Sequence, residues 1–136
     1  MSQVREYSAR RFAAGYRILH IAFVLIPIVA GIDKFFHRLV DWEMYLSPAA
    51  QRVLGTHAHL FMQISGIGEI CIGIGMFFLP RIFAYVVTAW LLSIVINLLL
   101  SGTYYDIALR DFVLALCALS LGRLSDAYKS DAAGPA

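Results

Sequence analysis

The stretch that decides the fold is LFMQISGIGEICIGIGMFFL, residues 60–79, followed after two residues by IFAYVVTAWLLSIVINLLL, residues 82–100. The first stretch contains one charged residue, Glu69, and the second contains none. About 20 apolar residues, rising about 1.5 Å each as a helix, cross the roughly 30 Å of hydrocarbon in a bilayer. Both stretches therefore predict transmembrane helices, and their two-residue connection makes them antiparallel neighbours.

The composition of the whole chain also indicates that it lies in a lipid bilayer. Of the 136 residues, 60% are apolar and 15% are charged, and the mean hydropathy is +0.74. Soluble domains contain about 45–50% apolar and about 25% charged residues, and a single domain of this size cannot bury the excess. A net charge of +2 provides no basic field for nucleic acid, and two cysteines are too few for a disulfide scaffold. The composition excludes both classes and indicates a membrane domain.

Two shorter apolar stretches, residues 18–32 and 112–122, flank the central pair. As helices they reach only about 22 Å and about 16 Å, so each must include neighbouring residues to cross a bilayer. We expect an all-α protein with four transmembrane helices in an antiparallel bundle. Their approximate ranges are 14–36, 58–79, 82–101 and 104–122. The last helix then draws Asp106, Arg110 and Asp111 toward the membrane, where charged side chains reach the interface or face a protein interior.

The basic residues predict the orientation of the bundle. Seven of them lie at one end of the predicted spans, whereas the four at the other end are accompanied by acidic residues. The seven are Arg5, Arg10, Arg11, Arg17, Arg81, Arg123 and Lys129. The positive-inside rule then places both termini in the cytoplasm, as expected for a multi-pass protein of the bacterial inner membrane. Residues 37–56, with Trp42 and a new segment at Ser47-Pro48, form an amphipathic outer loop, and residues 129–136 a short flexible tail.

Glu69 is the most informative polar residue. It lies in the middle of its span, where an ionised carboxylate costs on the order of 2.5–3.5 kcal/mol on insertion scales. The carboxyl group must therefore be protonated or paired, and its candidate partners are Lys34, Arg110 and Asn97. One interpretation is a proton-accepting group beside a buried quinone or other redox ligand. The alternative is a buried ion pair that only fixes the register of the helices.

Further charged residues lie at the ends of the predicted spans. Arg110 and Asp111 open the fourth span, and Arg110 either pairs with Asp106 at the interface or reaches inward to the central carboxylate or to a ligand oxygen. Asp33 and Lys34, at the end of the first span, leave the same two alternatives open. The predicted site contains two catalytic residues, Glu69 and Arg110, and four ligand-binding residues, Lys34, Asn97, Asp111 and Trp90.

The histidines and cysteines give weaker signals. No two histidines face each other at one depth of the predicted bundle, so we expect no haem. A metal site of His37 and His59 at the outer surface is an alternative to plain interface polarity, and we assign no metal ligand. Cys71 and Cys117 lack the Cys-x-x-Cys spacing of exchangeable thiols and are interpreted as packing residues. The sequence carries no flavin or iron–sulfur motif, so an electron carrier is expected on a partner.

Short motifs occur in all four predicted spans. They are Gly31-Ile32-Asp33-Lys34-Phe35, Gly66-Ile67-Gly68-Glu69-Ile70 with Gly73, Arg81 with Ala84, Tyr105 with Arg110-Asp111, and Leu124-Ser125-Asp126. In this order and spacing they resemble the DoxX family of small four-helix membrane proteins, over roughly residues 15–128. The chain differs from the family in its long, tryptophan-containing loop and in lacking a second glycine near Gly122.

The resemblance implies a function and a set of site residues. DoxX-like proteins are mostly described as quinone-linked oxidoreductase subunits; one branch resembles a subunit of thiosulfate:quinone oxidoreductase, and others associate with thiol or superoxide defence enzymes. The family pattern carries over to Lys34, Glu69, Arg110 and Asp111. We therefore expect a quinone-interacting subunit of a membrane redox or oxidative-stress complex, with a partner redox enzyme or a homo-oligomer.

Two alternatives to that function stay open. Distant relatives imply a non-catalytic membrane scaffold or chaperone, which would stabilise a partner protein through the glycine faces of the second span. Passage of protons or small molecules along the polar centre is the other, although four short helices are few for alternating access.

Overall fold

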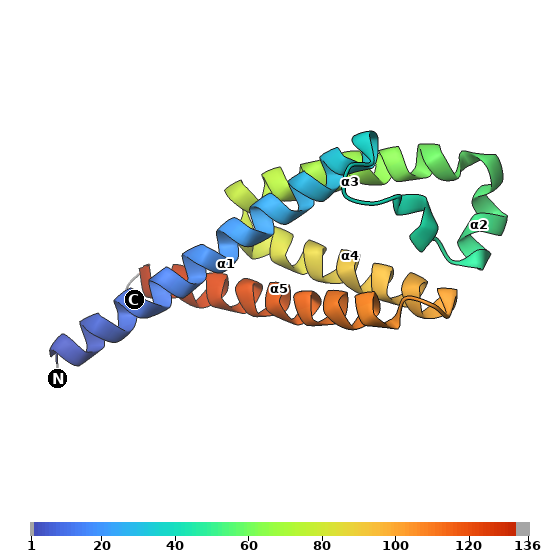
Figure 1. Ribbon diagram of the computed structural model, residues 1–136. Coiled ribbons are helices and arrows are strands. Elements are labelled where there is room, and N and C mark those ends of the chain that lie inside the picture. The colour runs from blue at the N-terminus through green and yellow to red at the C-terminus, as the bar shows by residue number, and fades with distance from the viewer. Residues whose placement is uncertain (1, 133–136) are drawn as a thin grey trace.

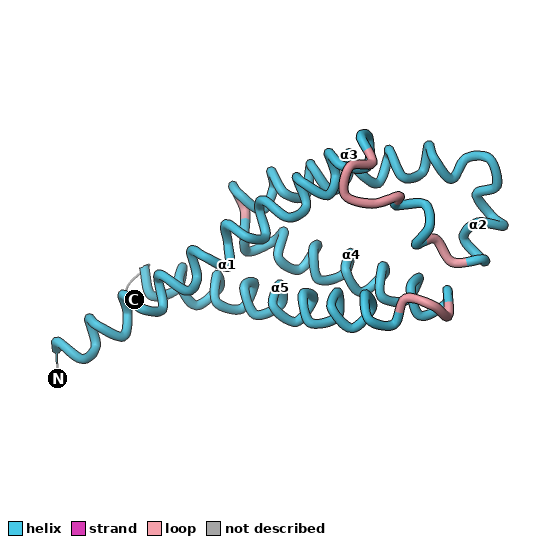
Figure 2. The backbone as a smooth tube through the Cα atoms, viewed as in Figure 1, coloured by secondary structure: helices cyan, strands magenta, loops and turns pink. Residues whose placement is uncertain are grey.

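The computed structural model describes the backbone of residues 2–132 and the side chains of residues 10–127. Within this range every regular element is helical, and no strand occurs (Figure 2). The elements are α1 (Ser2–Phe36), η1 (Trp42–Tyr45), α2 (Pro48–Leu54), η2 (Gly55–His57), α3 (Ala58–Phe78), α4 (Pro80–Ser101) and α5 (Tyr105–Ala132). The all-α prediction is confirmed. Of the predicted tail, residues 133–136 lie outside the described residues.

Local sequence signals set several helix boundaries. Ser47 accepts a hydrogen bond from the backbone N–H of Ala50 (3.2 Å) and so caps α2, which begins at Pro48 as the Ser-Pro pair predicts. Pro80 opens α4, because its fixed φ suits a first helical turn and its missing N–H needs no partner there. Gly102 ends α4 with a left-handed φ of 74°, which glycine adopts without strain. Because α3 ends at Phe78 and α4 begins at Pro80, the turn between them is short and the two helices run in opposite directions.

The four long helices are arranged as two pairs. α1 packs along α3, and α4 packs along α5, while contacts between the pairs are fewer (Figure 1). η1 and α2 lie over one end of the space between the pairs, and the start of α1 and the end of α5 lie toward the other end (Figure 1). The short elements and the two helix pairs together enclose the region in which the predicted polar residues meet.

Glycines set the close approach of α1 and α3. A Cβ atom on Gly66 would lie 2.7 Å from the carbonyl oxygen of Gly31, and one on Gly73 would lie 2.8 Å from that of Val24. Small residues let helix backbones approach closely in membranes. Gly68 faces elsewhere, and a Cβ atom placed on it would meet no atom within 4 Å. The interpretation of the glycine-rich stretch as a packing surface is confirmed for the face toward α1.

The buried core is small and the outer surface is apolar. One cluster of buried side chains gathers Phe23, Ile72, Met76, Ala84, Val87, Ala118 and Leu121, and a second gathers Val95, Leu98 and Ala108. On the outside, each long helix exposes large apolar side chains, such as Ile18 (72% exposed), Ile64 (59%), Ile96 (59%) and Leu109 (66%). Contiguous apolar surface of this kind is typical of a membrane contact.

Within the described part of the chain, three helical segments have the length and apolar composition needed to cross a bilayer. They are Arg10–Phe36, Pro48–Phe78 and Pro80–Ser101. Segments of this kind are typical of a membrane protein. α5 is not among them, because its uninterrupted apolar stretch, residues 112–122, lies between charged residues at both ends.

Candidate functional site

A buried ion pair joins the centre of α3 to the last turn of α1. The Nζ atom of Lys34 lies 2.6 Å from Oε2 of Glu69, and the two side chains are 5% and 8% exposed. The contact of Gly31 with Gly66 brings the two helices close enough for this bond. The prediction that Glu69 is enclosed by protein and paired with a basic residue is confirmed, and among its three candidate partners the ion-pair partner is Lys34.

Both tryptophans of the chain contact this pair. The indole N–H of Trp90, on α4, donates a hydrogen bond to Oε1 of Glu69 (3.2 Å). The ring of Trp42, on η1, lies 3.7 Å from the Nζ atom of Lys34, which is a cation–π contact. Each charged group therefore has its own indole, and the two indoles come from different elements.

Asp33 holds Trp42 in this position. Its carboxylate accepts hydrogen bonds from the backbone N–H groups of Arg38 (2.9 Å) and Leu39 (3.0 Å) and from the indole N–H of Trp42 (2.8 Å). These bonds fold the chain back after α1 and lay η1 across the end of the ion pair. Asp33 therefore adopts neither the interface ion pair nor the inward-facing arrangement expected for it, and instead caps the turn after α1. Trp42 was not predicted as a site residue, because a loop position has no periodic pattern that would place it.

Arg110 and Asp111 bring a second pair of charges to the same region from α5. The Nε atom of Arg110 lies 3.4 Å from Oδ1 of Asp111. Asp111 is buried, at 8% exposure, whereas the Arg110 side chain is 67% exposed. Arg110 thus pairs with its sequence neighbour, in neither of the two arrangements expected for it.

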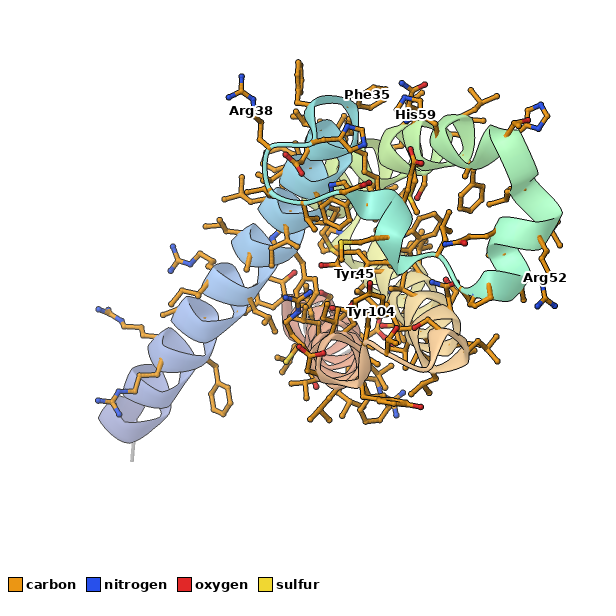
Figure 3. All side chains as sticks on the ribbon, turned by 45° about the vertical axis from the view of Figure 1, so that its right-hand side comes forward. Phe35, Arg38, Tyr45, Arg52, His59 and Tyr104 are labelled. Atoms are coloured by element: carbon orange, nitrogen blue, oxygen red, sulfur yellow. The ribbon has the colours of Figure 1, made fainter. Side chains whose placement is uncertain are left out.

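Asn97 closes one end of the site without touching Glu69. Its amide N–H donates to the carbonyl oxygen of Tyr45 (2.7 Å), and its amide oxygen accepts from the backbone N–H of Ser47 (2.9 Å). Tyr45 also meets Tyr104 edge-on, with ring centroids 4.9 Å apart (Figure 3). These contacts attach the η1–α2 segment to α4 and to the start of α5.

A cavity of about 350 Å³ lies between the two helix pairs beneath η1. All six predicted site residues line it, namely Lys34, Glu69, Trp90, Asn97, Arg110 and Asp111. Most of its other lining side chains are apolar or aromatic, including Phe61, Met62 and Leu98. Small-molecule sites are concave and mostly apolar with a few convergent polar groups, and they range from about 300 to about 1,000 Å³. The cavity has this character.

Other chemically versatile side chains lie away from the cavity. Cys71 is exposed on α3 and Cys117 is half-buried on α5, and neither forms a disulfide. The Nε2 atom of His20 contacts the carbonyl oxygen of Met76 at 2.7 Å, which satisfies the ring inside the bundle. His37 and His59 lie together near the end of α1, outside the cavity lining.

No family model, no curated protein and no solved structure matches this chain. Two of the motifs named above, residues 31–35 and residues 66–73, lie against each other. Gly31 contacts Gly66, and Lys34 contacts Glu69, so the first two motifs form one interface between α1 and α3.

Proposed function

We propose that this chain is a DoxX-like protein of the bacterial inner membrane that binds a quinone headgroup beside the Lys34–Glu69 pair. In this proposal it serves as a subunit of a membrane redox or oxidative-stress complex. The observation that carries the proposal is the cavity of about 350 Å³, whose apolar lining is interrupted by a buried ion pair and two indoles. A quinone headgroup matches this lining, because it is flat and apolar with two carbonyl oxygens.

The proposal includes α5 as a fourth span. α5 contains 28 residues, which correspond to about 42 Å of helix, enough to cross the hydrocarbon. Its outward side chains include Leu109 (66% exposed), Phe112 (43%), Val113 (50%) and Leu116 (49%). The exposed head of Arg110 would lie at the interface. Four spans put both termini on one side, and the positive-inside rule makes that side the cytoplasm.

The chemistry follows from the donors and acceptors in the cavity. The ammonium group of Lys34 has three N–H donors, so it can hold Glu69 and a quinone oxygen at once. Reduction of a quinone adds two electrons and two protons. Glu69 would take up one of these protons from water and pass it to a quinone oxygen, and the second would come from water or from the oxidised donor. Arg110 with Asp111 would orient the ligand from the rim of the cavity. The electrons would come from a partner redox protein or a diffusing thiol.

The proposal is tested by titrating the purified protein with a short-chain ubiquinone analogue. Trp42 and Trp90 are the two tryptophans of the chain and both line the cavity, so their fluorescence reports on its occupancy. We expect saturable quenching. Glu69→Gln should weaken binding at least about tenfold, because the Lys34 ammonium group that donates to the quinone oxygen loses the carboxylate that positions it. Asp106→Asn, an exposed acid outside the cavity lining, is the matched control and should bind normally. Quenching that never saturates, or that is equal in both variants, contradicts the proposal.

A second candidate function is the non-catalytic scaffold or chaperone. It is favoured by the open surface at Gly68, which lies between the exposed side chains of Ile64 (59%) and Ile67 (54%). A partner helix could approach α3 there, whereas the Gly66 face is occupied by α1. In that case Gly68→Leu should abolish recovery of a partner from membranes and leave the quinone titration unchanged. Unaltered partner recovery would remove this candidate.

A further inference from the structure

Three metal-ligating side chains from separate segments meet near the end of α1. They are His37, directly after α1, Glu43 in η1, and His59 in the first turn of α3. The Nδ1 atom of His59 lies 2.7 Å from Oε1 of Glu43, and the rings of His37 and His59 stack with centroids 5.6 Å apart. One ligand atom from each residue lies within 4.8 Å of the other two. The quinone site proposed above uses none of these side chains.

The backbone holds the two loop residues in place. His37 has a left-handed φ of 49°, which is uncommon for a residue other than glycine, and its N–H donates to the carbonyl oxygen of Asp33 (2.7 Å). This conformation turns the chain sharply after α1 and brings the His37 ring against His59. The N–H of Glu43 donates to the side chain of Asp41 (3.2 Å), which caps η1. The fold of this segment therefore sets the backbone positions of His37 and Glu43.

The donor set suits zinc. Zn²⁺ binds imidazole nitrogen and carboxylate oxygen at about 2.0–2.2 Å, and sites with three protein ligands keep a fourth position for water. Tetrahedral geometry at these bond lengths separates neighbouring ligand atoms by about 3.3 Å. The 2.7 Å contact of His59 with Glu43 has to open slightly and the longest separation, at most 4.8 Å, has to close. Both side chains have room to move, since they are 55% and 35% exposed.

A fourth residue supports the ring that would bind. Nε2 of His59 lies 3.2 Å from Nε2 of Gln63, one turn later on α3. If a metal binds Nδ1 of His59, the proton of the ring is on Nε2. That N–H can donate to the amide oxygen of Gln63 when the amide group is turned by about 180°, because the two ends of an amide are distinguished only by their hydrogen bonds. We propose that His37, Glu43 and His59 form a Zn²⁺ site that joins the end of α1, η1 and the start of α3.

The test is metal binding by the purified full-length protein, carrying no polyhistidine tag and freed of metal with a chelator. Zn²⁺ alone is titrated by calorimetry in a neutral buffer, and Co²⁺ alone is followed by the visible absorption of a tetrahedral complex. We expect one equivalent of either metal to bind. His37→Ala and His59→Ala should each weaken metal binding more than about 100-fold, because loss of a direct ligand costs more than the roughly 10–100-fold lost when a residue that supports a ligand is changed.

The control is His57→Ala, which removes an exposed histidine two residues from His59 and outside the cluster. It should bind both metals like the original protein, and so should Asp106→Asn, an exposed acid outside the cluster. Far-UV circular dichroism of each variant verifies that the helices are retained. Absence of metal binding, or equal binding in His59→Ala and His57→Ala, overturns the proposal.

Discussion

Replacing Lys34 by methionine while Glu69 stays in place should strongly destabilise the protein. The variant removes the cation 2.6 Å from Oε2 of Glu69 and leaves the carboxylate, at 8% exposure, facing the indole of Trp90. Removing one partner of a buried ion pair costs about 3–5 kcal/mol, because the other charge remains buried without compensation. Glu69→Gln should cost less, since the Lys34 ammonium group retains its cation–π contact with the ring of Trp42.

The double variant Lys34→Met with Glu69→Gln separates pairing from burial. It places neutral side chains of similar volume on both helices, and such replacements of a buried pair are often close to neutral. We therefore expect the double variant to be more stable than Lys34→Met alone. The coupling energy should be at least about 2 kcal/mol, toward the upper end of the range for residues in contact.

The assay is unfolding of the purified protein in mixed micelles by increasing amounts of SDS, followed by the fluorescence of Trp42 and Trp90. Both indoles contact the ion pair, so the signal reports on the region that the variants perturb. The exposed control Asp106→Asn should stay within about 0.5 kcal/mol of the original protein. If the double variant loses the sum of the two single losses, Lys34 and Glu69 do not interact, and the reasoning is refuted.

Three further outcomes are expected from other contacts. Gly66→Ala places a methyl group 2.7 Å from a backbone oxygen of α1 and should lower the free energy of unfolding by about 1–3 kcal/mol in the same SDS titration. Gly68→Ala, whose methyl group meets no atom, should be neutral or slightly stabilising. Equal losses in the two variants would show that α1 does not pack against Gly66. Asn97→Leu removes both hydrogen bonds from Asn97 to the η1–α2 segment. Limited proteolysis should then cut residues 37–57 faster while the long helices persist, and an unchanged cleavage rate would count against this attachment. Trp90→Phe removes the hydrogen bond to Glu69 and should weaken the quinone analogue several-fold, by about 1 kcal/mol; unaltered affinity would place the ligand elsewhere.

Much of the helical fold could be predicted from the sequence, because an apolar segment of about 20 residues is long enough to cross a bilayer as a helix. Residues 60–79 and 82–100 became α3 and α4 almost at the predicted bounds, and Pro80 gave the turn between them. The start of α1 at Ser2 could not be predicted in this way, since its first turns are polar and a search for membrane spans begins at the first apolar residue.

Six of the residues that line the candidate site could be predicted from the sequence, but which of them pair with each other could not. Lys34 and Arg110 are equally plausible partners of Glu69 in the sequence, because both are basic residues at the ends of predicted spans. Helix packing decides between them: the contact of Gly31 with Gly66 draws α1 onto α3, whereas α5 packs on α4 and leaves Arg110 beside Asp111.

The geometry of the η1 segment could not be predicted, although the sequence left open a site of His37 and His59. The position of Trp42 depends on three hydrogen bonds to Asp33, and the stacking on His59 depends on the left-handed backbone of His37. Neither feature follows from hydrophobic periodicity, which describes only helices and strands.

The central claim is that the enclosed Lys34–Glu69 pair forms a site for quinone, and extraction of the lipids that copurify with the protein tests it most directly. Mass spectrometry of the extract should find quinone in near-equimolar amount with the original protein and with Asp106→Asn. Glu69→Gln should retain little of it. A quinone-free extract from the original protein, or equal amounts in Glu69→Gln and Asp106→Asn, would contradict the account.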